Sequence, residues 1–242
     1  MHSCFSFGDR TTLDFGMRVE RYPRQLVPGR KMKTFPIAGR NGDLHALEDA
    51  WENYIQPSEV YFHDDIESAP EMAHAIAAWL MGGAGYQKLL DTYDPGHYRM
   101  ALFKGPMDIE NIMNRYGRCT IQFDCAPQSF LVGGDTPLVF EGAGSLHNVT
   151  SFDALPVITV YGDAPGTVTV GSTTVEIKEI SDPIILDCEM MQAYSKPGEG
   201  APVNRNGSVH ALPFPVLSPG ANAVSFSGGI SKLEIVPRWW TL

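Results

Sequence analysis

Apolar and polar residues alternate through most of the chain, and this period of two predicts short β-strands joined by turns. Within residues 86–130 four such segments follow one another: QKLLDTY, HYRMALF, MDIENIMN and RCTIQFDCAP. The sequence Asp94-Pro-Gly96 predicts a tight turn after the first of them. Beyond residue 135 the alternation continues in LPVITVYG, GTVTVGSTTVEIKEI, IILDCEMM, NAVSFSG and SKLEIVPRWW, with a hairpin turn at Gly171-Ser172.

The beginning of the chain has the pattern of a hairpin and a strand over residues 5–22, with a turn signal at Gly8-Asp9. Three prolines interrupt the stretch that follows: Pro23, Pro28 and Pro36. Because proline has no N–H to donate to a sheet, we expect residues 25–39 to include a long excursion away from it.

One segment has helical spacing. Ser68-Ala-Pro-Glu71 matches a capping box with proline in the first turn, and Gly82-Gly83 is expected to end the helix. Four apolar residues share one face of this helix: Met72, Ile76, Trp79 and Leu80. Packing against a core is the simplest role for such a stripe.

These elements predict a mainly β chain of two domains. At 242 residues the chain is long enough for two cores, and Gly133-Gly134-Asp135 is the best candidate linker. Residues 1–133 would form a β-domain that carries the helix. Residues 134–242, with short strands and regular turn signals, would form a β-sandwich.

The charge of the chain is unevenly distributed. Its 18 basic and 28 acidic residues give a net charge of −10, which argues against nucleic-acid binding. Residues 1–40 nevertheless carry eight basic residues against three acidic ones. Such a segment could be a DNA-binding arm or one half of a contact between identical subunits. Apolar residues interleave with its charges, as in a folded strand, and this favours the subunit contact.

The four cysteines predict neither a disulfide nor a zinc site. Cys119 and Cys125 flank one predicted strand, where six residues span about 20 Å, whereas a disulfide needs Cα atoms roughly 4–7 Å apart. No CxxC pair is present, so the spacing does not suit zinc either. Reduced thiols fit folding in a cytoplasm. The chain also shows no secretory signal and no apolar stretch of membrane-spanning length, so no membrane association is expected.

The segment YDPGHYRMA concentrates Asp94, His97, Tyr98 and Arg99, the side-chain types of an active site. On a strand, however, His97 and Arg99 face one side and Tyr98 the other, so the four groups cannot all converge. We therefore expect Asp94 to cap the turn, and Arg99 to pair with Asp91 or Asp94 across the hairpin. No catalytic residue is predicted.

Two further segments have partial signals for ligands. His63-Asp64-Asp65 could supply metal ligands, but neighbouring strand residues point in opposite directions and no second cluster lies at ligand spacing. The glycine-rich segment 82–88 follows a helix instead of preceding one and lacks the ending of a phosphate loop. We expect no metal ligands, no cofactor-binding residues and no cofactor.

Trp239-Trp240 is the last feature. Adjacent strand residues face opposite sides, so one tryptophan is expected in the core and the other exposed or at an interface. An exposed tryptophan on a β-sandwich could stack on a sugar ring. The alternative function is therefore a carbohydrate-binding module that uses Trp239, Trp240 or Tyr194. A third hypothesis, a hydrolase with a site around His97, has the least support.

Four stretches carry a combined signal: Gly39-Arg-Asn-Gly-Asp-Leu44, YDPGHYRMA with its continuation through MDIENIMNRYGRCTIQFDCAPQSFL, SFDALPVITVYG, and the ending SFSGGISKLEIVPRWWTL. Together they resemble the distal tail proteins (Dit) of long-tailed siphophages. The resemblance implies a structural virion protein without enzymatic activity. Its N-terminal domain would be a β-sandwich or split barrel with one α-helix, and its C-terminal domain a galectin-like β-sandwich.

The resemblance also implies the assembly. The N-terminal domains would form a homo-hexameric ring at the tail tip, between the tail tube and the tail-tip hub protein, with DNA passing through the lumen. Assembly would take place in the cytoplasm of a bacterial host. On this view six basic residues of one subunit meet an acidic face of its neighbour. These basic residues are Arg18, Arg21, Arg24, Arg30, Lys31 and Lys33.

Overall fold

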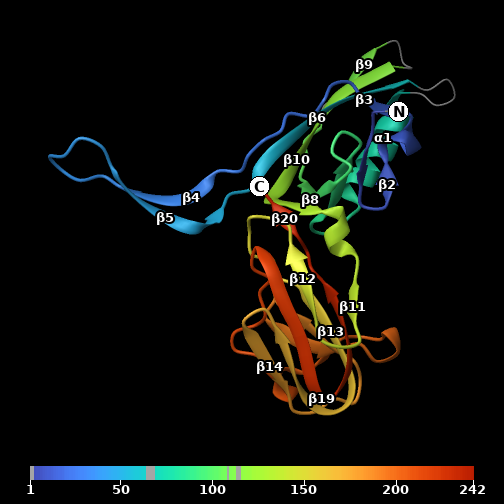
Figure 1. The fold of residues 1–242 in the computed structure, drawn as a ribbon. Coiled ribbons are helices and arrows are strands. Elements are labelled where there is room, and N and C mark those ends of the chain that lie inside the picture. Colours follow the sequence, from blue (N-terminus) through green and yellow to red (C-terminus); the bar gives the residue numbers. More distant parts are fainter. Residues whose placement is uncertain (1–2, 64–68, 108, 113–115) are drawn as a thin grey trace. The chain divides into compact units, whose positions relative to one another are not determined.

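The computed structural model describes residues 3–63, 69–107, 109–112 and 116–242. The chain divides into two compact units (Figure 1): Met1–Ser129 with Leu242, and Phe130–Thr241. The prediction of a mainly β chain is confirmed. Gly133-Gly134-Asp135, the expected linker, lies in the short 3-10 helix η2 (Val132–Asp135).

The first unit is built on one curled sheet with strand order β2-β1-β7-β8-β10-β6-β3, and β9 pairs with β10. Its strands are β1 (Phe5–Phe7), β2 (Arg10–Thr11), β3 (Met17–Val19), β6 (Tyr54–His63), β7 (Gln87–Asp91), β8 (His97–Phe103), β9 (Ile109–Ile112) and β10 (Tyr116–Leu131). At one end of this order the Val19 amide donates to the Ser3 carbonyl, 2.9 Å away. This bond brings β3 back to the segment that leads into β1, so the sheet curls toward closure.

The helix α1 (Ala69–Met81) packs on this sheet. It ends directly before Gly82-Gly83, as predicted, whereas the predicted cap Ser68 lies outside the described residues. The predicted apolar stripe is confirmed as part of the core: Met72, Ile76, Trp79 and Leu80. Trp79 stacks on Phe15, which belongs to the 3-10 helix η1 (Thr12–Phe15), and its indole N–H donates to the Phe7 carbonyl at 3.1 Å.

Two strands of the first unit stand apart from the sheet. β4 (Arg30–Phe35) and β5 (Leu44–Trp51) pair only with each other among the described strands, and they extend away from the rest of the unit (Figure 1). We call residues 30–51 the arm. The predicted excursion of residues 25–39 is thus confirmed, and its return strand is β5. Glu52 and Asn53 link β5 to β6 of the main sheet.

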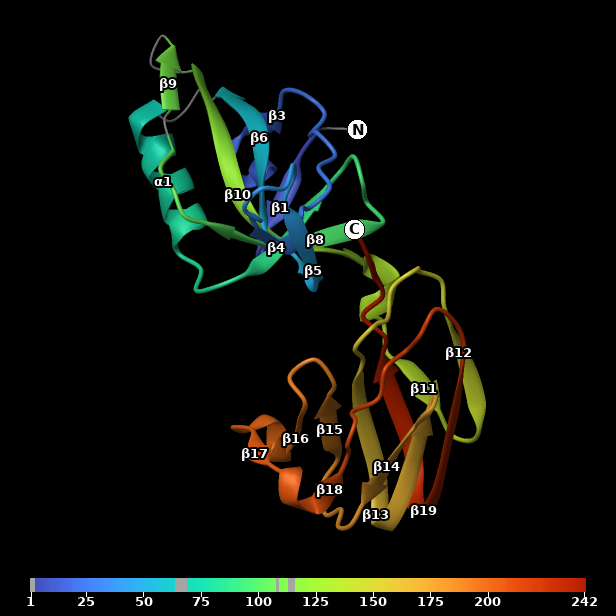
Figure 2. The ribbon, with the colours of Figure 1, turned by 90° about the vertical axis from the view of Figure 1, so that its left-hand side faces the viewer.

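The second unit is organised around two long strands, β13 (Val157–Val170) and β19 (Gly220–Val236), which run side by side (Figure 2). One half of this pair is flanked by β11 (Leu138–Phe140) and β15 (Ile184–Asp187). The other half is flanked by β12 (Gly144–Asn148) and β14 (Thr173–Ile177). Each long strand therefore contributes to both layers of a sandwich.

The remaining elements of the second unit are short. They are β16 (Gln192–Ser195), η3 (Pro197–Glu199), β17 (Val203–Asn204), η4 (Asn206–Ser208), β18 (Val209–His210) and β20 (Trp240–Thr241). The predicted hairpin turn is confirmed: Val170 pairs with Thr173, and Gly171 has φ of +59°. The core consists of inward-facing alternate residues, including Ile158, Val160, Val168, Val170, Val175, Ile177, Leu233 and Ile235.

The long strands bend where one layer passes into the other. The register of β13 against β19 shifts at Tyr161-Gly162 and again between Gly162 and Gly166, which marks bulges. A Cβ on Gly162 would lie 2.4 Å from the carbonyl oxygen of Gly229. The two backbones thus approach more closely than any side chain would allow.

None of the helices in the described residues is long and apolar enough to cross a membrane.

Candidate assembly surface

The arm exposes apolar side chains on both of its faces. Met32 lies opposite Leu47, and Phe35 lies opposite Leu44. Residues that pair directly share a face and successive residues alternate, so these two pairs lie on opposite faces. The four residues are 50%, 59%, 48% and 52% exposed, respectively. No core within the described part of the chain covers them.

A two-stranded hairpin without a hydrophobic face to pack on is at best marginally stable in water. Large apolar side chains gathered on an exposed element usually mark a surface that contacts another molecule. The arm therefore has the properties of an assembly element. The prolines in the sequence predict only that the outgoing strand leaves the sheet. Asn41-Gly42, a strong hairpin signal between two alternating runs, could have revealed β5 as its partner.

The six basic residues predicted at a subunit contact are distributed over three places. Arg18 lies on β3, Arg21 and Arg24 lie on the segment that leads to the arm, and the others lie on the arm: Arg30, Lys31 and Lys33. They do not all lie on one element.

Three of the six form exposed ion pairs with acidic residues of β5 and β6. Arg30 lies 3.1 Å from Asp49, Lys33 lies 3.2 Å from Glu48, and Arg21 lies 3.5 Å from Glu59. A charge count over residues 1–40 does not include these partners, because strand pairing brings acids from later in the sequence next to the basic residues. Lys31 and Arg24 form no ion pair with another described residue.

The segment that leads to the arm crosses the polar loop between β7 and β8. Tyr22 lies against Tyr93 with ring centroids 4.0 Å apart, and the Gln56 side chain donates to the Arg24 carbonyl at 3.2 Å. These residues, with Asp91, Asp94 and Arg99, line a cavity of about 230 Å³.

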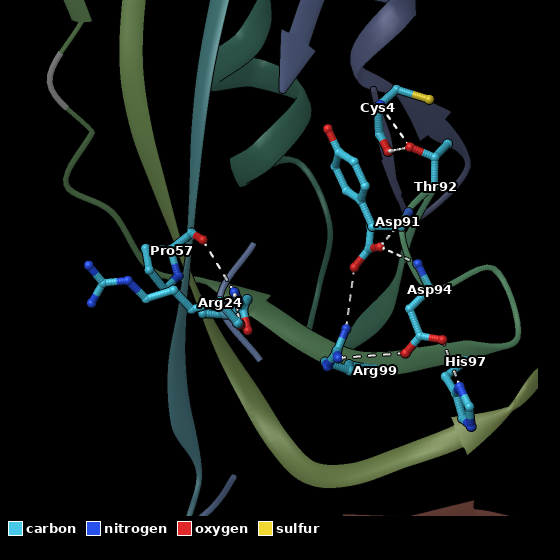
Figure 3. A network of polar contacts seen from close by, with 10 residues as sticks. Cys4, Arg24, Pro57, Asp91, Thr92, Asp94, His97 and Arg99 are labelled. Carbon is cyan, nitrogen blue, oxygen red and sulfur yellow. Dashed lines mark hydrogen bonds and ion pairs between the residues drawn. The ribbon is translucent and has the colours of Figure 1, made fainter. Parts of the chain in front are cut away.

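The polar cluster in YDPGHYRMA is a structural network (Figure 3). Arg99 lies 3.4 Å from Asp91 and 4.0 Å from Asp94, and the His97 ring nitrogen Nδ1 lies 2.8 Å from Asp94. Tyr98 is buried on the opposite face of β8, as predicted. The predicted pairing of Arg99 with acids across the hairpin is confirmed.

The predicted role of Asp94 needs a correction. Asp91 accepts the backbone N–H groups of Tyr93 and Asp94, at 2.9 and 2.8 Å, so Asp91 is the residue that caps the loop. The Asp94 carboxylate instead holds His97. Thr92 adds a further tie by donating its hydroxyl to the Cys4 carbonyl at 3.0 Å (Figure 3). The loop is longer than the Asp94-Pro-Gly96 turn, and its first acid is better placed to accept these bonds.

The described residues hold no group of three or more metal-ligating side chains. Asp64 and Asp65 of the His63-Asp64-Asp65 segment lie outside the described residues. Cys119 and Cys125 both lie on β10, as predicted, and both are buried. Burial raises the pKa of Cys119 to about 11 and that of Cys125 to about 12, so both stay protonated at neutral pH.

The expectation of an exposed tryptophan at the C-terminus is wrong. Trp239 and Trp240 are only 7% and 9% exposed. Trp240 stacks on Phe152, with ring centroids 4.4 Å apart, and donates its indole N–H to the Asp153 carbonyl at 2.9 Å. Strand alternation does not apply to this pair, because β19 ends at Val236 and β20 begins at Trp240, which leaves Trp239 outside both strands.

Tyr194, the third residue of the carbohydrate alternative, is half-buried in β16. It lines a groove of about 340 Å³ with Gln192, Lys196 and Asn204. The Lys196 ammonium lies 5.7 Å from the centroid of the Tyr194 ring. This groove combines an aromatic ring with two side-chain amides and one ammonium group.

Comparisons with known proteins agree with this architecture. Residues 17–125 match the family described as the phage tail protein RIFT-related domain. Curated protein sequences contain no significant match. Among solved structures, the chain is similar to the crystal structure of the SPP1 Dit protein, described as a paradigm of the hub adsorption apparatus in phages that infect Gram-positive bacteria. That similarity has a TM-score of 0.69 at 11% identity and covers 100% of both chains. Residues 17–125 therefore carry a phage tail protein domain, and the whole chain has the fold of a siphophage distal tail protein, as the sequence predicted.

Proposed function

We propose that the chain is a non-enzymatic structural component of a phage tail, and that it assembles as a homo-hexameric ring at the distal end of the tail. The observation that carries the proposal is the arm, which exposes apolar pairs on both faces in a chain with a distal-tail fold. A second copy of the chain is the occupant that would cover these pairs, because a head-to-tail ring joins two different surfaces of identical subunits.

The ring would join the tail tube to the tail-tip hub protein, and DNA would pass through its lumen. The net charge of −10 supports this role, since an acidic or neutral lumen would not retain DNA. Lys31 and Arg24, which form no ion pair with described residues, are the best of the six basic residues to meet an acidic face of the neighbour. The protein would assemble in the host cytoplasm and reside at the tip of the virion tail.

Light scattering of the purified chain, with negative-stain images of the same peak, tests the ring directly. We expect six times the chain mass and a six-fold ring with an open centre. Virions carrying a tagged chain provide the second test, with gold particles directed against the tag. Label at the tail tip supports the proposal. A stable monomer at high protein concentration, together with virions that carry no label at the tip, would overturn it.

A carbohydrate-binding role remains the second candidate, and the groove at Tyr194 favours it. An aromatic ring bordered by the amides of Gln192 and Asn204 suits stacking and hydrogen bonding to a sugar. A glycan array probed with the wild type, with Tyr194→Ala and with the ring-retaining Tyr194→Phe tests this role. Binding that Tyr194→Ala abolishes and Tyr194→Phe retains would support it. An array without bound glycans would exclude those glycans as ligands.

A further inference from the structure

The arm is joined to the main sheet by a link of two residues, and one of them is fixed in place. Asn53 donates its side-chain N–H to Oδ1 of Asp124 on β10, at 2.8 Å. The ammonium of Lys104, which follows β8, donates to Oδ2 of the same carboxylate. The side-chain amide of Asn53 also donates to the hydroxyl of Tyr86, the residue directly before β7. Three separate parts of the unit thus meet at the point where the arm returns.

The Asp124 side chain is buried and both of its oxygens are hydrogen-bonded. The residue is only 8% exposed, and each carboxylate oxygen accepts a hydrogen bond from a different donor. The hydrogen bond from Lys104 is the main cause that lowers the pKa of Asp124, so the carboxylate stays ionised. A buried carboxylate that loses a donor is left with an unsatisfied oxygen, so Asn53 is held strongly.

The outgoing side of the arm is tied to the same sheet. The buried Gln56 side chain on β6 donates to the Arg24 carbonyl, and the Glu52 amide donates to the Gly29 carbonyl at 2.8 Å. The bond between Glu52 and Gly29 joins the outgoing and returning segments at the base of the arm. Holding Asn53 in place therefore holds both segments at once.

We propose that Asn53, Lys104 and Asp124 form a clamp that sets the direction in which the arm leaves the sheet. Asp124 and Asn53 are then positioning residues for assembly, since the direction of the arm determines where it meets a second copy. The inference depends on the proposed ring only for that consequence, because the orientation of the arm is a property of a single chain.

The direct test measures the distance from the arm to the sheet. Spin-labelled non-natural amino acids would replace Arg40, near the tip of the arm, and Thr120 on β10, both exposed. Mixing with excess unlabelled chains restricts the measurement to distances within one chain, whether or not rings form. We expect one narrow distribution in the wild type and at least a twofold broader one in Asn53→Ala. Arg118→Gln, which breaks an exposed ion pair with Glu20, is the matched control and should keep the wild-type width.

A swap of chemical groups separates this role from a general loss of stability. Asn53→Asp places two carboxylates together and should broaden the distribution most. Combining it with Asp124→Asn restores one donor and one acceptor, and should narrow the distribution again. Lys104→Gln, at an exposed side chain, supplies an intermediate case if the stronger variants do not fold.

Wild-type widths in Asn53→Ala and Lys104→Gln would overturn the clamp. So would a double variant that stays as broad as Asn53→Asp. If the widths respond as expected but the wild-type protein never forms a ring, the clamp stands and the proposed assembly fails. The two conclusions are therefore tested separately.

Discussion

The Arg99 guanidinium lies 3.4 Å from the Asp91 carboxylate, and the two side chains are only 13% and 12% exposed. This pair joins the end of β7 to the early part of β8, and Asp91 also accepts two backbone N–H groups of the loop between them. The acid and base of this segment are thus occupied in holding a loop together. The arrangement explains a cluster of polar residues without any catalytic role.

Asp91→Ala should destabilise the first unit by about 3 kcal/mol, because it leaves the Arg99 charge buried, and among the described residues its one remaining acidic partner is Asp94, 4.0 Å away. Urea unfolding followed by tryptophan fluorescence measures this change. His97→Ala is the control, since His97 and Asp94 are each 32% exposed and such a pair contributes less than about 1 kcal/mol. Equal losses in the two variants would contradict the structural role assigned to Asp91.

Most of the fold could be predicted because it depends on local patterns. Strand alternation located β7, β8 and β10, and the spacing of Met72, Ile76 and Trp79 located the buried face of α1. Period and turn chemistry are properties of neighbouring residues, so one sequence is sufficient to recognise them.

The residues that were predicted wrongly depend on contacts between distant segments or on the position at which a strand ends. The acids that pair with Arg30 and Lys33 lie on β5, across a hairpin that the sequence analysis did not complete. Trp239 lies between β19 and β20, outside regular strand, so alternation does not describe Trp239 and Trp240, and both are buried. The Asp124 cluster, similarly, joins residues that are up to 71 positions apart.

The apolar pairs of the arm give a prediction about assembly. Met32→Ser with Leu47→Ser should lower the mass measured by light scattering from that of a ring toward that of one chain. The melting temperature of the dissociated chain should change little, because these side chains are exposed within it. Phe35→Ser with Leu44→Ser tests the other face in the same way.

Leu13→Ser is the matched control for these arm variants, since Leu13 is an exposed leucine outside the arm. It should leave the mass unchanged. If the arm variants assemble as well as Leu13→Ser does, the arm does not carry the subunit contact.

The buried thiols predict how the protein responds to alkali. Burial raises the pKa of Cys119 to about 11 and those of Cys125 and Cys188 to about 12. A raised pKa favours the protonated thiol in the folded state, so this contribution to stability is complete below the unfolded pKa of about 8.5. It is lost as the pH rises from there toward 11–12.

Urea unfolding at pH 8 and pH 10 should therefore show a lower free energy of unfolding at the higher pH. Replacing the three buried cysteines by alanine should reduce that pH dependence, whatever it does to absolute stability. Iodoacetamide at pH 8 should also modify the partly exposed Cys4 first. Fast modification of all four thiols in the folded protein would contradict their burial.

The close approach of β13 and β19 gives the sharpest prediction about the second unit. A methyl group on Gly162 would lie 2.4 Å from the Gly229 carbonyl oxygen, and a backbone atom cannot move aside as a flexible side chain can. Gly162→Ala should therefore lower the free energy of unfolding by about 2–3 kcal/mol, the upper part of the usual range for inserting an atom into a packed site. Gly142→Ala is the matched control, because a Cβ there meets nothing within 4 Å, and its effect should stay within about 0.5 kcal/mol. Urea unfolding of both variants measures the two changes in the free energy of unfolding. Similar unfolding midpoints would mean that β13 and β19 can move apart without a loss of stability, and that the bend does not require glycine.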